Sequence, residues 1–354
     1  MRFALSEDQR LLQESVGRAL GELAPLERVR AYAEGGDFAD VWRGLAEMGL
    51  PGLLIPEEHG GLGLGLLEAA VAAEAMGAAV APGPFLGSVL APLALRGGTP
   101  EQQVRWLPRL ASGEATACIA ISEAVAGARD GAGVEASDGR LTGKALFVLD
   151  AQGADLLIVA DRAGGLHLVE QPPAAGAMAT IDATRRLSEV TFEGTPAEPL
   201  ASNDGLERLR DAAWVMLAAD TLGASQAMID KAVAYAKERQ QFGRVIGSFQ
   251  AVKHMCAEMV AELEPARALV WYAAYAFDHA PQEATVMAAH AKAHLAEIGR
   301  FIARTSTEVH GGIGITDLLG LHYWFKRIGL NRQLYGGPER VREAAARAQG
   351  LVPA

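Results

Sequence analysis

KERQQFGRVIGSFQAVKH, residues 237–254, concentrates positive charge in a chain that is acidic overall. The 354 residues include 32 Lys and Arg against 43 Asp and Glu, a formal net charge of −11. Arginine offers a planar fork of donors to a phosphate, and glycine lets backbone N–H groups approach a ligand closely. The segment therefore indicates a phosphate site or a solvated basic turn, and its composition leaves both interpretations open. Its single acid is Glu238, and its cations are Lys237, Arg239, Arg244 and Lys253.

Helical patterns lie on both sides of this basic segment. One helix is predicted from near Leu206 to Lys237, and another starts near Phe249. A third begins at Pro281, a favoured first-turn residue, and runs to the stop at His310-Gly311-Gly312. A fourth starts at Thr316. Four long amphipathic helices with short connections predict a bundle after Asn203.

Towards the N-terminus the patterns are helical as well. Ser6-Glu7-Asp8-Gln9 is a capping box, and apolar residues follow it at helical spacing. Helical patterns, interrupted by the glycine-rich loop EEHGGLGLG at 57–65, continue to about residue 112. Residues 75–95 lack charge, but three prolines interrupt them, so they predict loop and short buried helices, and no membrane segment.

Between these helical parts the pattern is that of strands. Short aliphatic or β-branched runs are separated by turn dipeptides such as Asp138-Gly139 and Gly164-Gly165. They predict a small antiparallel β domain. The whole chain is thus predicted to be an α+β protein of three domains: an N-terminal helical domain (1–113), a middle β domain (114–202) and a C-terminal four-helix bundle (203–354). The runs are ACIAIS, KALFVLD, DLLIVAD, LHLVE and SEVTFEG.

Composition and motifs exclude several functional classes. The acidic balance argues against a nucleic-acid binder. Cys118 and Cys256 lie far apart and form no CxxC pair, which is typical of a reducing compartment. The N-terminus has no apolar signal-peptide core, so a cytoplasmic location is predicted. No strand–GxGxxG–helix unit is present. His290 and His294 are spaced for one helix face but lack further ligands, so no metal site is predicted.

Two motifs in this chain resemble signatures of the acyl-CoA dehydrogenase family. The first, R-x-x-F-G-x-x-I-x-x-F-Q-x-x-x-H, runs from Arg239 to His254. The second, H-G-G-x-G-x-T, runs from His310 to Thr316. The order of helical, β and helical parts is similar too, so the resemblance, to short bacterial members, covers essentially the whole chain. It implies an FAD-dependent dehydrogenase of an acyl-CoA thioester, serving fatty acid or steroid catabolism.

The resemblance also assigns cofactor contacts in the helical part. Arg239, Phe242 and Gln250 would reach FAD bound mainly by a neighbouring subunit, which implies a homodimer, a homotetramer or a heterotetramer. Gly311 and Gly312 would let the backbone pass close to the cofactor. Glu308 stands where the family usually has Gln near FAD, and a second negative charge beside a diphosphate is unfavourable unless Arg304 pairs with it.

In the β domain the resemblance assigns contacts to the flavin ring. The I-S-E sequence at Ile121, Ser122 and Glu123 corresponds to the family's V-T-E, whose hydroxyl and backbone meet the ring. Phe147 and Val148 correspond to a strand that holds a tryptophan and a threonine in many members. Ser122 keeps the hydroxyl, whereas Val148 does not.

The catalytic base of the family is missing from its usual positions. A carboxylate takes the α proton while the flavin accepts a hydride from the β carbon, and this base needs close placement and a raised pKa. Gly336 stands at the usual glutamate of Y-E-G-T, and Ala213 at the alternative position on the first bundle helix. Three other carboxylates are candidates: Asp220 amid apolar neighbours, Asp317 near a T-x-E position, and Glu339 behind Pro338.

Three functions remain open at this point. The chain is a self-sufficient acyl-CoA dehydrogenase with a relocated base, or a base-less subunit of a heteromeric dehydrogenase whose partner supplies the base. The third function is other flavin chemistry on the same fold, such as that of the monooxygenases and nitroalkane oxidases.

Overall fold

The computed structural model describes residues 4–201 and 205–352. The boundary predicted between residues 202 and 203 lies outside these ranges, and the division into domains stays a prediction. The N-terminal part is helical, and its first helix begins at the predicted capping box: the Ser6 hydroxyl accepts from Gln9 N at 3.1 Å. Its helices are α1 (Glu7–Leu23), α2 (Leu26–Ala33), α3 (Ala39–Glu47), η1 (Leu50–Gly52), η2 (Glu57–His59), α4 (Leu66–Ala78), α5 (Phe85–Leu95) and α6 (Pro100–Ala111).

The uncharged stretch 75–95 forms two buried helices with a break between them, as its prolines predict. Helix α4 crosses the long bundle helix α8 (Gly205–Glu238) at a pair of glycines. A Cβ on Gly77 would lie 1.9 Å from Asp220 O, and one on Gly223 would lie 1.8 Å from Glu74 O. Only glycine permits this approach of the two backbones. Among the described helices, none combines the length and apolar character needed to cross a membrane.

The middle part consists of two four-stranded sheets, with strand orders β1-β4-β5-β8 and β2-β3-β7-β6. The antiparallel prediction holds for every pair within them except β1 and β4, which run parallel with Ala117 opposite Leu156. Between β1 and β4 the chain forms β2 and β3 of the other sheet. This crossover connection allows β4 to run parallel to β1. The elements are β1 (Ala117–Ala120), α7 (Ser122–Ala126), β2 (Gly133–Ser137), β3 (Arg140–Leu149), β4 (Leu156–Ala160), β5 (Leu166–Val169), β6 (Ala175–Met178), β7 (Leu187–Pro196) and β8 (Glu198–Leu200).

The C-terminal part is the predicted helical bundle, with two differences. The helix predicted from Thr316 begins at Leu321 instead, because the Thr316 hydroxyl donates to Ile313 O at 2.7 Å and closes a 3-10 turn. A further helix, α12, follows it. After α8 the elements are β9 (Gln240–Gln241), β10 (Arg244–Val245), η3 (Ile246–Ser248), α9 (Gln250–His279), α10 (Pro281–His310), η4 (Gly311–Ile315), α11 (Leu321–Gln333) and α12 (Pro338–Ala348).

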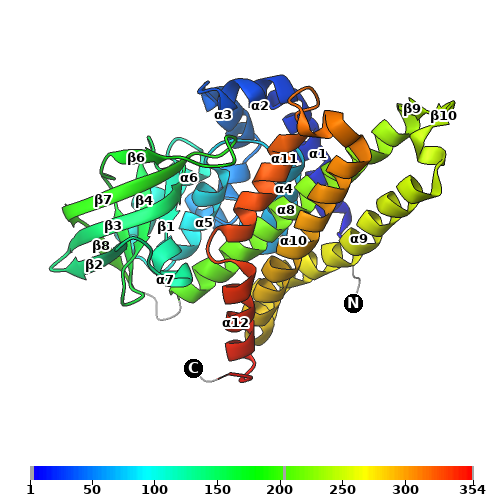
Figure 1. Cartoon of the computed structure of the whole chain (residues 1–354). Helices are drawn as coiled ribbons and strands as arrows, with labels where there is room; N and C mark the ends of the chain where they lie inside the picture. The colour runs from blue at the N-terminus through cyan, green and yellow to red at the C-terminus, as the bar shows by residue number, and fades with distance from the viewer. Residues whose placement is uncertain (1–3, 202–204, 353–354) are drawn as a thin grey trace.

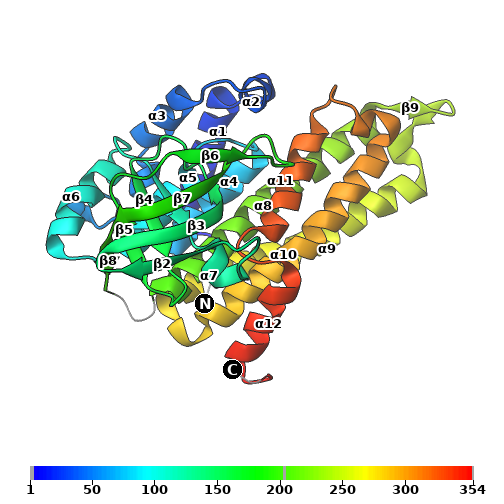
Figure 2. The ribbon, with the colours of Figure 1, turned by 60° about the vertical axis from the view of Figure 1, so that its left-hand side comes forward.

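The parts lie in a row along the molecule. The two sheets form one end, and helix α5 lies beside them (Figure 1). The β9–β10 hairpin, which joins α8 to α9, forms the opposite tip, and a view turned by 60° shows the same separation (Figure 2). The hairpin therefore projects from the bundle far from the β domain of its own chain.

Candidate functional site

A pocket of about 180 Å³ lies where the β domain meets the end of helix α11. Its walls come from α7, strand β3, the β6–β7 loop (179–186) and the turn between α11 and α12. Polar or aromatic lining residues are Ser122, Glu123, Arg129, Phe147, Thr180, Gln333 and Tyr335. Two of these, Ser122 and Phe147, are residues that the sequence assigned to the flavin ring.

An irregularity in strand β3 directs Phe147 into the pocket. The register with β7 shifts between Ala145 and Val148, and Phe147 has a φ of +58°. Such a bulge adds a residue and re-aims side chains. Val148 and Ile121 are both fully buried, and neither lines the pocket. A direct ring contact by their side chains is therefore not favoured, and the assignment of Ser122 and Phe147 stays a prediction.

Glu123 is a pocket residue to which sequence reasoning gave no role. Its Oε1 accepts a hydrogen bond from the backbone N–H of Leu146 at 2.8 Å. Burial raises the pKa of this carboxyl above its usual range. The I-S-E motif already contained the residue, but only the tertiary structure shows that its carboxylate supports the strand that carries Phe147.

The turn after α11 is fixed by a contact with the first bundle helix. Trp214 Nε1 donates to the carbonyl oxygen of Tyr335 at 2.8 Å, and both side chains are buried. Tyr335 has a φ of +55°, and Gly336 follows with a φ of +110°. Ala213 and Gly336 are the two usual positions of the family's base. Each is the sequence neighbour of a residue in this hydrogen bond: Ala213 precedes Trp214, and Gly336 follows Tyr335. A side chain at residue 336 would be strained by this backbone.

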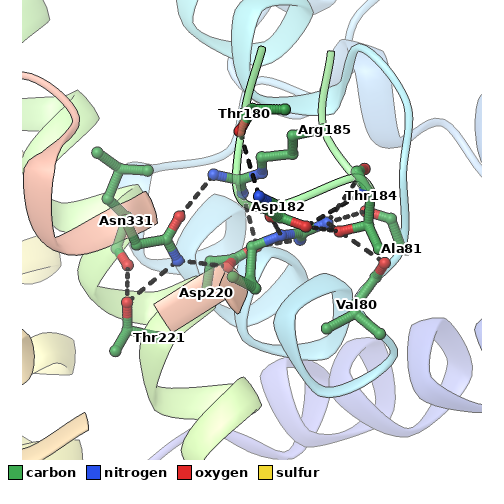
Figure 3. A network of polar contacts seen from close by, with 11 residues as sticks. Val80, Ala81, Thr180, Asp182, Thr184, Arg185, Asp220, Thr221 and Asn331 are labelled. Carbon is green, nitrogen blue, oxygen red and sulfur yellow. Dashed lines mark hydrogen bonds and ion pairs between the residues drawn. The ribbon is translucent and has the colours of Figure 1, made fainter. Parts of the chain in front are cut away.

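The three carboxylates considered as relocated bases do not line this pocket. Asp220 is buried and fully paired: it accepts from Arg185 at 2.8 Å, from Arg327 at 3.2 Å and from Asn331 at 2.6 Å (Figure 3). Asp317 and Glu339 have side chains that are 72% and 78% exposed. A proton-abstracting carboxylate needs a water-poor position close to its substrate, so the geometry favours none of the three as a base.

The basic segment forms the exposed hairpin. Arg239, Phe242 and Gln250 are all exposed, and Phe242 reaches 92%. Phe242 packs edge-on against Phe249 with ring centroids 6.2 Å apart, and the Arg244 guanidinium lies 4.0 Å from the Phe249 ring. The aromatic residues therefore stiffen the hairpin, while its arginines remain accessible to an anion.

The glycines of the second motif lie near the base of this hairpin. Tyr235, in the last turns of α8, stacks on His310 with ring centroids 4.8 Å apart. A Cβ added to Gly311 or Gly312 would meet no atom within 4 Å, so their backbone is open to a ligand. Glu308 is exposed, and its Oε1 lies 3.7 Å from Arg304 Nη2. This is the arginine that the sequence analysis named as the partner for a carboxylate at this position.

The sequence-predicted residues thus form two groups in one chain. Ser122 and Phe147 lie in the pocket, whereas the hairpin residues lie at the far tip of the bundle (Figures 1 and 2). The two groups therefore lie at different ends of the chain's fold. That one cofactor meets both groups through a second subunit stays a prediction of the sequence.

Comparisons with known proteins identify the family. The model "Acyl-CoA dehydrogenase, N-terminal domain" matches residues 6–114, and "Acyl-CoA dehydrogenase, C-terminal domain" matches residues 209–350. The acyl-CoA dehydrogenase IpdE2 of Mycolicibacterium smegmatis is 34% identical over 348 residues, which cover 97% of this chain and 99% of that protein.

Two solved structures are similar over nearly the whole chain. The ChsE4-ChsE5 complex from Mycobacterium tuberculosis contains a chain with a TM-score of 0.90 and 27% identity, and all of both chains is covered. The Tcur3481-Tcur3483 steroid ACAD G363A variant gives a TM-score of 0.89 and 29% identity, with 98% of each chain covered.

Fold and comparisons together define an FAD-dependent oxidoreductase. The chain belongs to the acyl-CoA dehydrogenase family.

Proposed function

We propose that this chain is the base-less subunit of a heteromeric acyl-CoA dehydrogenase, which oxidises the α,β bond of a thioester together with a second dehydrogenase-like subunit. Two similar structures support a heteromer, since one is the ChsE4-ChsE5 complex and the other joins Tcur3481 with Tcur3483. The latter is a steroid dehydrogenase, so a steroid-derived thioester is the first substrate class to test.

The observation that carries the proposal is the lack of a free carboxylate at the pocket. Residue 336 is glycine, and its φ of +110° disfavours any side chain. Glu123 is the one carboxylate that lines the pocket within the described residues, and it is engaged with Leu146 N. Removal of a weakly acidic α proton needs a placed base, so we infer that the partner subunit supplies it.

The residues present fit FAD shared between two subunits. The pocket offers the Ser122 hydroxyl and the Phe147 ring, and the exposed hairpin offers Arg239 for a diphosphate. Bound FAD supplies the hydride acceptor. Three exposed apolar residues of the C-terminal part, Phe242, Ile315 and Leu318, favour burial against a partner; their exposures are 92%, 78% and 74%.

A second candidate function is a self-sufficient dehydrogenase that uses Glu123 as its base. Its pocket position and its burial-raised pKa favour this role. The hydrogen bond from Leu146 N argues against Glu123 as the base. It occupies one oxygen of the carboxylate and thereby fixes the position of the other oxygen.

The test is anaerobic flavin reduction by the purified chain, first alone and then with the second subunit. We expect poor bleaching of flavin by straight-chain and steroid-like acyl-CoA thioesters with the chain alone, and turnover when the partner is added. Since base assistance contributes about 10²–10⁴-fold, the difference should be of that order. Rapid bleaching by the chain alone contradicts the proposal. If Glu123→Gln then abolishes it, Glu123 is the base; if Asp220→Asn, Asp317→Asn or Glu339→Gln does, that residue is.

A further inference from the structure

Helix α11 ends at Gln333 beside the pocket, and the last four carbonyl groups of an α-helix have no partner within the helix. In α11 the outer two of these four accept from the turn that follows. Leu334 N donates to Leu330 O at 3.1 Å, and Gly336 N donates to Gln333 O at 3.2 Å. Within the described residues, no backbone N–H beyond the helix reaches the two carbonyls between them.

A lysine from a neighbouring helix reaches both of these carbonyls. Lys292, on α10, donates from Nζ to the carbonyl oxygen of Asn331 and, at 3.3 Å, to that of Arg332. The residue is only 3% exposed. Lysine is almost never buried this far without a partner, because desolvation of its charge is costly. The two carbonyls are the partners that the structure gives Lys292, and the lysine therefore caps the C-terminal end of α11.

The carbonyls that Lys292 holds lie one and two residues before the segment that lines the pocket. Gln333, Leu334 and Tyr335 are all lining residues. On the other side of the same turn, Trp214 of α8 donates from Nε1 to the carbonyl oxygen of Tyr335 at 2.8 Å. Two bundle helices, α10 and α8, therefore hold this part of the pocket wall at both of its ends.

The charged groups around Lys292 are engaged with one another. On α11, Arg332 lies 3.0 Å from Glu297 of α10, and Glu339 of α12 lies 3.8 Å from the same guanidinium. On α8, Asp220 is paired with two arginines. The other cations near Glu297 are Arg300 and Arg342. Within the part of the chain that the structure describes, no carboxylate pairs with Lys292, so its nitrogen is held by carbonyl oxygens.

The charge of this lysine changes near neutral pH. Burial lowers the pKa of Lys292 from 10.5 to about 7, and the positive charge of Arg332 acts in the same direction. An ammonium group has three donors and is attracted to the negative end of the helix dipole. The neutral amine still has donors for two carbonyls but loses this attraction. Protonation of Lys292 therefore strengthens its hold on the end of α11.

We propose that Lys292 is a positioning residue, whose nitrogen holds the end of α11 and thereby sets the place of residues 333–335 in the pocket wall. It acts through the turn and not by touching a ligand. The inference rests on the proposed function for the role of the pocket, whereas the position of the turn can be measured in the chain without a cofactor.

The indole N–H of Trp214 reports on the turn, because it donates to Tyr335 O. In a chain with isotope-labelled tryptophan, nuclear magnetic resonance gives a separate indole signal for each of the five tryptophans, and Trp214→Phe identifies the relevant one. We expect Lys292→Met, which has no donor, to shift the Trp214 signal. The signal of Trp106, whose Nε1 donates to Glu170 Oε1 at 2.6 Å, should stay in place.

The second measurement is the pH dependence of the Trp214 signal. In the parent chain the signal should move with a midpoint near pH 7, and Lys292→Met should remove this movement. Asp150 titrates in the same range and acts electrostatically on Tyr335, so its contribution has to be separated. In Asp150→Asn the movement should persist. If it is absent there, the carboxyl is its cause and the inference is wrong, and this measurement decides even if Lys292→Met does not fold.

Titration with FAD in the presence of the second subunit connects the turn to binding. Lys292→Met should bind FAD roughly two- to tenfold more weakly, the value of one neutral hydrogen bond. Lys326→Met, an exposed lysine on α11 itself, is the matched control and should leave both the Trp214 signal and FAD affinity unchanged.

An unmoved Trp214 signal in folded Lys292→Met overturns the inference, even if the unfolding midpoint decreases, because the lysine then contributes to stability alone. A shifted signal with unchanged FAD affinity supports the hold of Lys292 on the turn and contradicts the proposed use of the pocket instead.

Discussion

Arg327 donates from Nε to Asp182 Oδ2 at 2.7 Å, and neither side chain has any exposed surface. Its other donors reach Asp220 on α8 and the carbonyl oxygens of Val80 and Ala81 between α4 and α5 (Figure 3). One guanidinium therefore joins the N-terminal helices, the β6–β7 loop and the bundle. The same loop lines the pocket with Thr180, so this ion pair helps to set the pocket wall.

We expect Arg327→Met to lower the free energy of unfolding by about 3–5 kcal/mol, because it leaves Asp182 buried without its charged partner. Urea denaturation measures the loss. Arg347→Met, which removes an exposed pair with Glu343 on α12, is the control and should change stability by at most about 0.5 kcal/mol. Adding Asp182→Asn to Arg327→Met should recover part of the loss. A fully stable Arg327→Met would show that the network contributes nothing.

Asp150 should make stability depend on pH. Burial raises its pKa from 3.8 to about 7, although Arg185, Arg327 and Arg186 act in the opposite direction. The folded chain then binds a proton that the unfolded chain has released, so stability decreases as pH rises from about 4 to about 7. The slope from this group is at most about 1.4 kcal/mol per pH unit.

Asp150→Asn should remove this dependence and make the chain more stable than the parent at pH 8. Denaturation midpoints across the pH range test it. Asp150 has a φ of +53°, a conformation that asparagine tolerates well, so the exposed Asp130, with a φ of +50°, gives the matched control Asp130→Asn. Parallel pH profiles of parent and Asp150→Asn would contradict the expectation.

Arg239→Ala should weaken FAD binding without unfolding the chain. A charge-assisted contact to phosphate contributes about 1.5–3 kcal/mol, roughly 10- to 150-fold in affinity. Since Arg239 is exposed on the hairpin, circular dichroism and the unfolding midpoint should not change. Arg18→Ala, an exposed arginine on α1, is the control in the same titration. Equal FAD affinity in all three proteins would mean that the hairpin does not meet the cofactor.

Gly336→Glu should fail to restore a base. The φ of +110° makes any side chain there strained, at a cost of about 1–3 kcal/mol. Gly336→Ala carries the same strain without the carboxylate, so both variants should be destabilised alike and neither should speed flavin reduction by acyl-CoA. Faster reduction in Gly336→Glu alone would show that the backbone accepts glutamate and that only the side chain was missing.

The sequence predicted the fold and the family well, whereas its site residues stay predictions. Capping at Ser6, Pro281 as a first-turn residue and the long helical periods are local signals, and the structure has these elements where expected. The predicted helix start at Thr316 was wrong. The Thr316 hydroxyl donates a hydrogen bond to Ile313 O and closes a tight turn, and in the sequence a threonine at such a turn resembles a helix N-cap. Asp220 as a base stays a prediction that the geometry does not favour. Its partners Arg185, Arg327 and Asn331 are distant in sequence, so no local pattern shows that they pair with it.

The sequence by itself determined the order of helical, β and helical parts, the basic hairpin and the glycine at residue 336, since periodicity and motif spacing are properties of neighbouring residues. Tertiary structure alone decided which side chains share the pocket. Phe147 enters it through a strand irregularity, Glu123 turns to Leu146, and Tyr335 is held by Trp214 from another helix. Such contacts depend on packing between segments that are far apart in the chain. The pattern of neighbouring residues in the sequence therefore does not encode them.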